Sequence, residues 1–269
     1  MRRKLLGIYW WLKRRIAPGI KSSQCIYRSV LIQHLKRRPR WLDLGCGHQF
    51  LPDWAGVPDA ELLASLPRIV GVDGNLESIQ QHKSLKHRVL SDIEVLPFQA
   101  ESFDLITANM VMEHVLHPER VLKEVRRVLA PGGFFIFHTP NSSCPPVVIA
   151  SHTPDALKRF IVRLLEGRAD EDIYSTAYQI NDPRRAVQLA SEAGLLVESC
   201  DLVTSEAMTA VLGPLAAFEL VYIRMTQWKA LAALRPDMIV VFRKPAISSG
   251  SDQVKMGESA SLAVSNRTH

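Results

Sequence analysis

Cysteine is scarce in this sequence, and the cysteines are far apart along the chain. The four cysteines are Cys25, Cys46, Cys144 and Cys200. None forms a C-x-x-C pair, so the sequence predicts neither a disulfide framework nor a thiolate zinc site. We expect free thiols in a reducing cytoplasm. Long apolar runs are also missing, because the most apolar stretch, residues 214–234, is interrupted by Glu219, Arg224 and Lys229. These charges argue against a membrane span.

Acidic residues are absent from the first 40 positions, which hold twelve of the 33 lysines and arginines. The rest of the chain carries 21 basic residues against all 27 acidic ones, so the body is mildly acidic. A body of that sign argues against a broad nucleic-acid-binding face. We expect no nucleic-acid partner for the body, and only the basic segment offers a surface for one.

That segment begins MRRKLLGIYWWLKRRIAP, which predicts a short helix. Its uncharged part, residues 5–12, is too short to span a bilayer, and the basic KRR that follows argues against a secretion signal. Two interpretations stay open. Leu5, Trp10 and Trp11 dock the helix on the body, or residues 1–20 contact an anionic membrane surface with aromatics inward and cations toward headgroups. The second would bring a cytoplasmic protein to the inner membrane face.

Apolar runs alternate with helical patterns along residues 40–246. This alternation predicts an α/β fold: a Rossmann-like, mostly parallel sheet with helices on both faces and a late antiparallel strand. Strands are expected at 40–44, 68–73, 87–92, 102–109, 133–140, 195–203 and 237–244. Helices are expected at 22–38, 59–66, 117–129, 153–165, 181–194 and 214–234, the fifth capped by Asp182. Asn75 is expected to cap a further helix after the second strand.

Three parts follow from this pattern. Residues 1–39 form a basic helical N-terminal extension, residues 40–246 the main domain, and residues 247–269 a disordered tail rich in serine and small residues.

The stretch WLDLGCGHQF, residues 41–50, ends a predicted strand with two glycines. Open α/β sheets bind ligands at such strand ends, and glycine lets the backbone turn while a ligand approaches closely. A tight structural turn would need the same residues. A dinucleotide-binding fingerprint requires a third glycine at position 50, where this chain has Phe50, so pyrophosphate binding is disfavoured. Asp73 and Asp92 end the next two strands, where carboxylates suit the ribose and the adenine amino group of a nucleoside.

Five motifs in order, WLDLGCG, VGVD, LSDIEVLPF, SFDLITANMVMEHV and VLKEVRRVLAPGGFFIFHTPN, resemble those of class I S-adenosylmethionine-dependent methyltransferases. The resemblance is greatest to the group with quinone-biosynthesis and glycan-modifying enzymes, and it covers residues 40–141. It implies S-adenosyl-L-methionine as the cofactor. The matching cofactor-binding positions are Asp43, Gly45, Cys46, Gly47, Asp73, Gly74, Asp92, Ile93, Asn109 and Met110. The chain departs from many members at Gln49, where they have a third glycine.

The resemblance implies methyl transfer to a small molecule, a sugar or a lipid-linked glycan, and we expect oxygen as the accepting atom. Such an acceptor needs a base, for which His114 and His138 are the candidates; helix packing is the alternative role of His114. The spacing of His114 and His117 differs from H-E-x-x-H, so we expect no metal site. Regions of about 142–182 and 205–235 should shape the acceptor pocket, with Tyr174 and Tyr178 as amphipathic rings and His152 on a lid. The alternatives are a non-catalytic cofactor-binding or regulatory subunit and an RNA-directed methyltransferase that uses the basic arm.

Overall fold

The computed structural model describes residues 2–36, 39–50, 69–82, 84–145, 147–148, 176–205, 214 and 216–246. Its strands are β1 (Trp41–Leu44), β2 (Ile69–Asp73), β3 (His87–Leu90), β4 (Phe103–Asn109), β5 (Leu129–Pro140), β6 (Leu196–Val203) and β7 (Asp237–Arg243). Its α-helices are α1 (Arg2–Ile16), α2 (Ser23–Leu35), α4 (Leu76–Gln81), α5 (Pro118–Val128), α8 (Pro183–Glu192) and α9 (Ala216–Met225). Two 3₁₀ helices are η2 (Met112–His114) and η5 (Lys229–Leu234).

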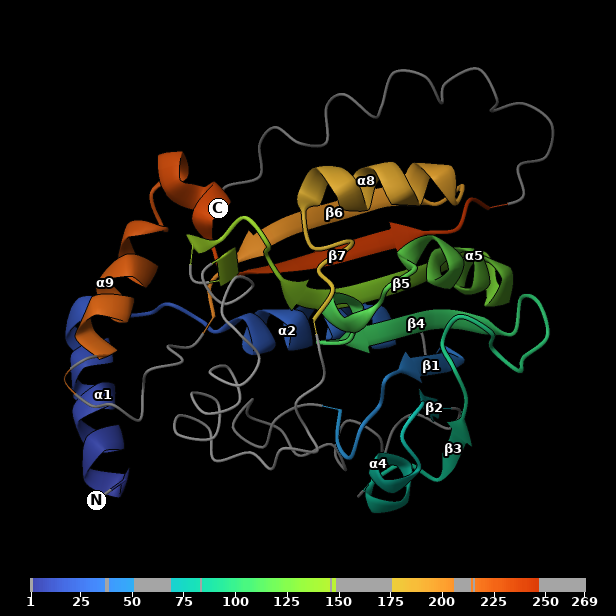
Figure 1. Cartoon of the computed structure of the whole chain (residues 1–269), viewed down its shortest axis with the longest axis horizontal. Coiled ribbons are helices and arrows are strands. Elements are labelled where there is room, and N and C mark those ends of the chain that lie inside the picture. Colours follow the sequence, from blue (N-terminus) through green and yellow to red (C-terminus); the bar gives the residue numbers. More distant parts are fainter. Residues whose placement is uncertain are drawn as a thin grey trace.

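The strands form one seven-stranded sheet in the order β3-β2-β1-β4-β5-β7-β6 (Figure 1). Neighbours pair in parallel except at β7, which runs antiparallel to both β5 and β6. The predicted α/β class, mostly parallel sheet and late antiparallel strand are therefore confirmed. The strand order reverses between β1 and β4, so the carboxyl ends of these two strands form the topological switch point, where ligands of such sheets bind.

One face of the sheet packs against α5 and α8. Four residues of α5 that recur at helical spacing, Val121, Leu122, Val125 and Val128, are fully buried. They share an apolar cluster with alternate residues of β1, β4, β5 and β7, among them Leu42, Ile106, Phe137 and Val240. This alternation follows from the two-residue period of a strand, which sends every second side chain to the same face. Pro118 lies in the first turn of α5 and Asp182 caps α8, as expected.

The opposite face packs against α2. Tyr27, Leu31 and Leu35 of this helix join a second cluster with Trp41, Leu105, Ile136 and Ile239, which are the other alternate residues of the same strands. Ser22 caps α2, and the helix ends at Leu35, before the last basic residues of the expected 22–38 range. The expected division of the chain at residue 39 stays a prediction, although α2 is packed closely on the sheet.

Helix α1 does dock on the body, but its tryptophans are not the docking residues. Tyr9 and Ala17 pack with Ala216, Leu220 and Ile223 of α9 in a separate buried cluster, and Figure 1 shows the two helices beside the sheet. Trp10 and Trp11 stay about half exposed. None of the described helices is both long enough and apolar enough to cross a bilayer.

Two expected elements differ in the structure. The single helix expected at 214–234 is divided into α9 and η5. Thr226 bonds back to the Ile223 carbonyl, and the extended backbone of Trp228 ends the helical path. The strand expected at 133–140 begins earlier, at Leu129, which pairs with Phe103 across an irregular register. The helices expected at 59–66 and 153–165, and the tail 247–269, lie outside the described residues.

Candidate active site

The turn after β1 has the two glycines in left-handed backbone conformations, with φ of +63° at Gly45 and +54° at Gly47. Their surroundings differ. A Cβ on Gly45 would lie 2.4 Å from Cγ2 of Val111, whereas a Cβ on Gly47 would meet no atom of the described residues within 4 Å. Gly74, after β2, is open in the same way. Gly45 is thus required by packing, while no described side chain crowds Gly47 or Gly74, and a glycine there suits a closely held ligand.

Asp73, the last residue of β2, joins the two turns at this edge. Its Oδ2 accepts a hydrogen bond from the Gly47 amide at 2.9 Å, and its Oδ1 accepts one from the Asn75 amide at 2.8 Å. Asn75 in turn caps α4, as expected. Each carboxylate oxygen has a second acceptor position. The carboxylate is therefore fixed in place and still able to accept hydrogen bonds from a ligand.

Asp43 differs from Asp73 because it is buried on the α2 face, with 5% of its surface exposed. Thr107 donates a hydrogen bond to Asp43 Oδ1, and the Trp41 indole donates to the Thr107 hydroxyl at 2.7 Å. Burial raises the pKa of the Tyr27 phenol well above its usual value, and the nearby Asp43 charge raises it further. This polar chain of Trp41, Thr107 and Asp43 holds the end of β1 against β4. Neither Thr107 nor the nearby Tyr27 was predicted.

Cys46, between the two glycines, contributes its backbone and an inert side chain. Its amide donates to the Val72 carbonyl at 3.0 Å. Its thiol is buried close to Gly71. Burial raises the pKa of the Cys46 thiol, and the Asp43 and Asp73 charges act in the same direction, so the sulfur stays protonated and unreactive.

Asn109, at the end of β4, is the centre of a second polar network. Its amide nitrogen donates to Gln24 Oε1 at 3.1 Å and to the Phe50 carbonyl at 3.2 Å. Its Oδ1 accepts from Gln24 Nε2 and lies 2.9 Å from His138 Nδ1. Because Oδ1 only accepts, His138 must carry its proton on Nδ1. Gln24 of α2 therefore contacts the carboxyl end of β4, where the ligand is expected to bind. No sequence motif indicated this contact.

His138 is enclosed, with 1% of its surface exposed. Its ring stacks on Tyr27 at a centroid distance of 5.6 Å, and its Nε2 lies 3.5 Å from Asp237 Oδ2. The next residue after Asn109, Met110, has φ of +57°, a strained value for a residue with a side chain. Its amide donates to the His138 carbonyl at 2.8 Å, which fixes this turn. The base role of His138 stays a prediction.

Asp92 and Ile93 follow β3 at the outer end of the same edge. Asp92 is exposed, and its Oδ1 accepts from the Glu94 amide at 2.8 Å. Ile93 is half-buried against the apolar cluster of the α5/α8 face. The Ser91 amide donates to the Asp73 carbonyl at 3.1 Å. This hydrogen bond holds the loop after β3 next to Asp73, the predicted ribose-binding residue.

Glu113 is a site residue that sequence reasoning missed. It is 3% exposed, and its Oε2 accepts a hydrogen bond from the Thr139 hydroxyl at 2.9 Å. Asn181 donates to the same hydroxyl at 2.6 Å. Burial raises the pKa of Glu113 to about 7, although the Thr139 hydrogen bond opposes this. The available signal was its position as the single acid in the apolar run MVMEHV.

His114 follows directly and is accessible, with 31% of its side chain exposed and its Nε2 3.8 Å from Glu113 Oε1. The Ala177 and Tyr178 amides donate to the Glu113 carbonyl at 2.7 and 3.1 Å, so the described end of the predicted pocket region is fastened beside this pair. Tyr178 has φ of +51° and is half-buried. His152 and Tyr174 lie outside the described residues.

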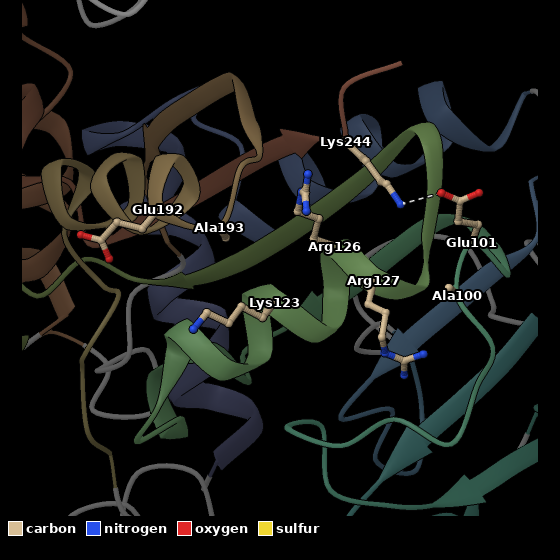
Figure 2. Close-up of a pocket in the computed structure, with 8 residues that line it drawn as sticks. All are labelled: Ala100, Glu101, Lys123, Arg126, Arg127, Glu192, Ala193 and Lys244. Atoms are coloured by element: carbon tan, nitrogen blue, oxygen red, sulfur yellow. Dashed lines mark hydrogen bonds and ion pairs between the residues drawn. The ribbon is translucent and has the colours of Figure 1, made fainter. Parts of the chain in front are cut away.

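A hollow of about 480 Å³ lies elsewhere, near the start of β4 and the end of β7 (Figure 2). It is lined by Ala100, Glu101, Lys123, Arg126, Arg127, Glu192, Ala193 and Lys244. Two of its cations are paired, Lys244 with Glu101 at 3.2 Å and Arg127 with Glu124 at 2.7 Å. The hollow lies at the amino ends of the parallel strands, whereas the glycine turns lie at their carboxyl ends. Within the described ranges, no three His, Cys, Asp or Glu side chains gather closely enough to hold a metal ion.

The chain is similar in sequence to known methyltransferases. The ubiquinone biosynthesis O-methyltransferase of Homo sapiens is 36% identical over 110 residues, which are 38% of this chain and 29% of that protein. The enzyme of the same name from Coxiella burnetii is 35% identical over 109 residues, 37% of this chain and 43% of that protein. The chain thus spans less than half the length of these curated relatives.

The crystal structure of an S-adenosylmethionine-dependent methyltransferase from Mesorhizobium loti has the same fold, with a TM-score of 0.53 and 18% identity over 81% of this chain and 96% of that chain. A family model described as a methyltransferase domain matches residues 24–199. The open glycine turns and the fixed Asp73 carboxylate fit S-adenosylmethionine, the cofactor of this family. The chain belongs to the methyltransferase-domain family.

Proposed function

We propose that this methyltransferase transfers the methyl group to a hydroxyl oxygen of a small organic molecule, a sugar or a lipid-linked glycan. The observation that carries the proposal is the pair Glu113–His114, which follows the cofactor-side turn at Met110 and combines a buried acid with an accessible imidazole. A hydroxyl acceptor must lose its proton, and an imidazole next to a carboxylate is suited to take it.

The cofactor is assigned to the switch point. Asp73 would accept hydrogen bonds from the ribose hydroxyls, and Gly47 and Gly74 give room for the ligand. Asp92 and Ile93 would hold the adenine, the first by its carboxylate and the second by apolar contact. Asp43, Gly45, Cys46, Asn109 and Met110 complete the assigned set. When bound, the cofactor supplies an electrophilic methyl carbon, so the main task of these residues is alignment.

His114 is assigned the role of base. Glu113 lies 3.8 Å away, and its carboxylate in the ionised form would favour the imidazolium that results from proton transfer. His138 is the second candidate. Its enclosure by Tyr27, Asn109 and Asp237 fits a role in holding Asn109 better than direct contact with an acceptor.

The relatives support oxygen as the accepting atom, because two of them are named as O-methyltransferases of ubiquinone biosynthesis. The acceptors of these relatives are not assigned to this chain. A lipid-linked acceptor for this chain is supported by its own basic, aromatic N-terminal helix.

The test combines binding with product detection. Calorimetry with S-adenosylhomocysteine measures the cofactor site, and a methyl-labelled donor added to extracts of cells lacking the gene identifies the acceptor by mass spectrometry. With that acceptor, His114→Ala should lower kcat by about 100-fold or more and leave S-adenosylhomocysteine binding unchanged. His117→Ala, three residues on and about half exposed, is the matched control and should keep full activity.

Full activity of His114→Ala would refute its role as base. Labelling only on nitrogen or carbon would refute oxygen as the acceptor atom. Binding of S-adenosylhomocysteine with no labelled product in any extract would favour the non-catalytic alternative.

A further inference from the structure

Helices α1 and α9 form a pair whose inner faces are fully used. Tyr9 and Ala17 of the α1 segment are buried against Ala216, Leu220 and Ile223 of α9, and Leu12 and Ile16 pack around them. All of these belong to one side of each helix, as the three- to four-residue spacing requires.

The outer face of α1 is nevertheless rich in aromatic and basic residues. Trp10 and Trp11 are 50% and 53% exposed, and Ile8 is exposed as well. Lys13 Nζ lies 5.0 Å from the Trp10 ring centroid, and Arg15 Cζ lies 5.6 Å from that of Trp11. Folding does not explain two exposed indoles next to the exposed Arg14 and Arg15, since solvated surface charges stabilise a fold very little. Their arrangement indicates a partner.

Helix α9 adds apolar surface to the same pair. Phe218, Val221 and Met225 recur at helical spacing and are exposed, with Phe218 at 79%, and Trp228 follows them. Exposed apolar residues in a row mark interaction sites more often than isolated ones do. Among the described residues of the pair, α1 has no acid, and the one acid of α9, Glu219, is half-buried.

We propose that the outer face of α1, with Ile8, Trp10, Trp11, Arg14 and Arg15, binds an anionic membrane surface. Indole rings prefer the boundary between acyl chains and headgroups, and cations next to them attract anionic lipids. A single-stranded RNA would also attract cations and aromatics, but aliphatic side chains such as Ile8 give its bases nothing to stack on. This surface is separate from the methyl-transfer site, and its test does not require the acceptor to be known.

The test is sedimentation of the full chain with vesicles of mixed phosphatidylcholine and phosphatidylglycerol, compared with pure phosphatidylcholine. Binding should require phosphatidylglycerol and weaken at high salt. Arg14→Gln with Arg15→Gln should weaken binding roughly 30-fold, equivalent to about 2 kcal/mol for two cations. Trp10→Ser with Trp11→Ser should weaken it by about tenfold or more. Neither variant changes a residue that docks α1 on α9. Circular dichroism should show that both keep the secondary structure of the wild type.

The matched control is Arg184→Gln with Arg185→Gln, an adjacent exposed pair on α8. It should bind vesicles like the wild type. Equal losses in the α1 and α8 variants would mean general charge attraction and overturn the proposal. Failure of the wild type to sediment at low salt would also overturn it, as would binding to polyuridylate in its place through the same α1 residues.

Discussion

The two faces of the sheet are built from the same strands, yet they carry different side chains. Toward α5 and α8, the central strands present the apolar residues Leu42, Leu44, Ile106, Ala108, Phe135, Phe137, Met238, Val240 and Phe242. Toward α2, four neighbouring strands present Asp43, Thr107, His138 and Asp237 near their ligand end, covered by Tyr27 and Gln24. The first face stabilises the fold by burial of apolar area. The second exchanges part of that gain for polar groups that are fixed by one another and set the shape of the ligand edge.

The largest effect should come from the apolar face. Phe137→Ala removes a fully buried ring between Phe135 and Phe242, and the free energy of unfolding should fall by about 3–5 kcal/mol. Urea unfolding measures it. The same change at the exposed Phe218 should alter stability by less than about 0.5 kcal/mol. A small loss at Phe137 would mean that the α5/α8 face repacks readily and does not govern stability.

Glu113 tests the cost of one buried acid. Its pKa is raised to about 7, so between pH 4.5 and 7 the folded chain keeps a proton that the unfolded chain has lost. Stability is therefore lost as pH rises through this window, by about 3 kcal/mol in all. Glu113→Gln mimics the protonated acid and should be more stable than the wild type at pH 8, with the gap closing toward pH 4.5. Urea unfolding at several pH values measures this gap, and a constant difference would contradict the assignment.

Thr107→Val tests the polar face with almost no change of volume. It removes the acceptor of the Trp41 indole and a donor to Asp43, so stability should fall by about 1–3 kcal/mol. Thr226→Val is the control, because among the described residues that buried hydroxyl donates to a single acceptor, the Ile223 carbonyl of the preceding helix α9, and a smaller loss is expected. If denaturant titrations show equal losses of stability in the two variants, the Trp41–Thr107–Asp43 hydrogen bonds contribute no more to stability than a single helix-end hydrogen bond.

Asp73→Ala should act on binding more than on stability. The change removes an acceptor for ribose hydroxyls and for the Gly47 and Asn75 amides, and each charge-assisted hydrogen bond contributes about 1.5–3 kcal/mol. Affinity for S-adenosylhomocysteine should fall by about tenfold or more in calorimetry. Asp73→Asn keeps one acceptor oxygen and should fall less. If the dissociation constant is unchanged in Asp73→Ala, the ribose is held by another residue.

Local patterns were sufficient for much of the fold. The apolar runs predicted each of the seven strands to within a few residues, and the caps Asn75 and Asp182 were found where expected. They were insufficient for the long apolar stretch after residue 213, where α9 ends at Met225 and η5 follows. Helical propensity is continuous there, so it did not indicate the break, which the structure places at Thr226, bonded back to the Ile223 carbonyl, and at the extended backbone of Trp228.

The candidate site divides in the same way. Gly45, Gly47 and Asp73 could be predicted, because a strand end, a left-handed turn and a carboxylate are properties of consecutive residues. Gln24, Tyr27 and Thr107 could not, because each acquires its role from a partner distant in sequence. The Gln24–Asn109 amide pair spans 85 positions, and Tyr27 stacks on His138 from a helix that the sequence marked only as basic.

The sequence by itself determined the order of the strands along the chain, the glycine turn, and the excess of positive charge before residue 41. These depend on periodicity, backbone freedom and composition, which are local quantities. Only the tertiary structure decided which polar groups are buried together, that Glu113 is enclosed while His114 is accessible, and that Tyr9 docks α1 while Trp10 and Trp11 remain exposed. Burial depends on what packs against a residue from elsewhere in the chain, and a one-dimensional pattern does not contain that information.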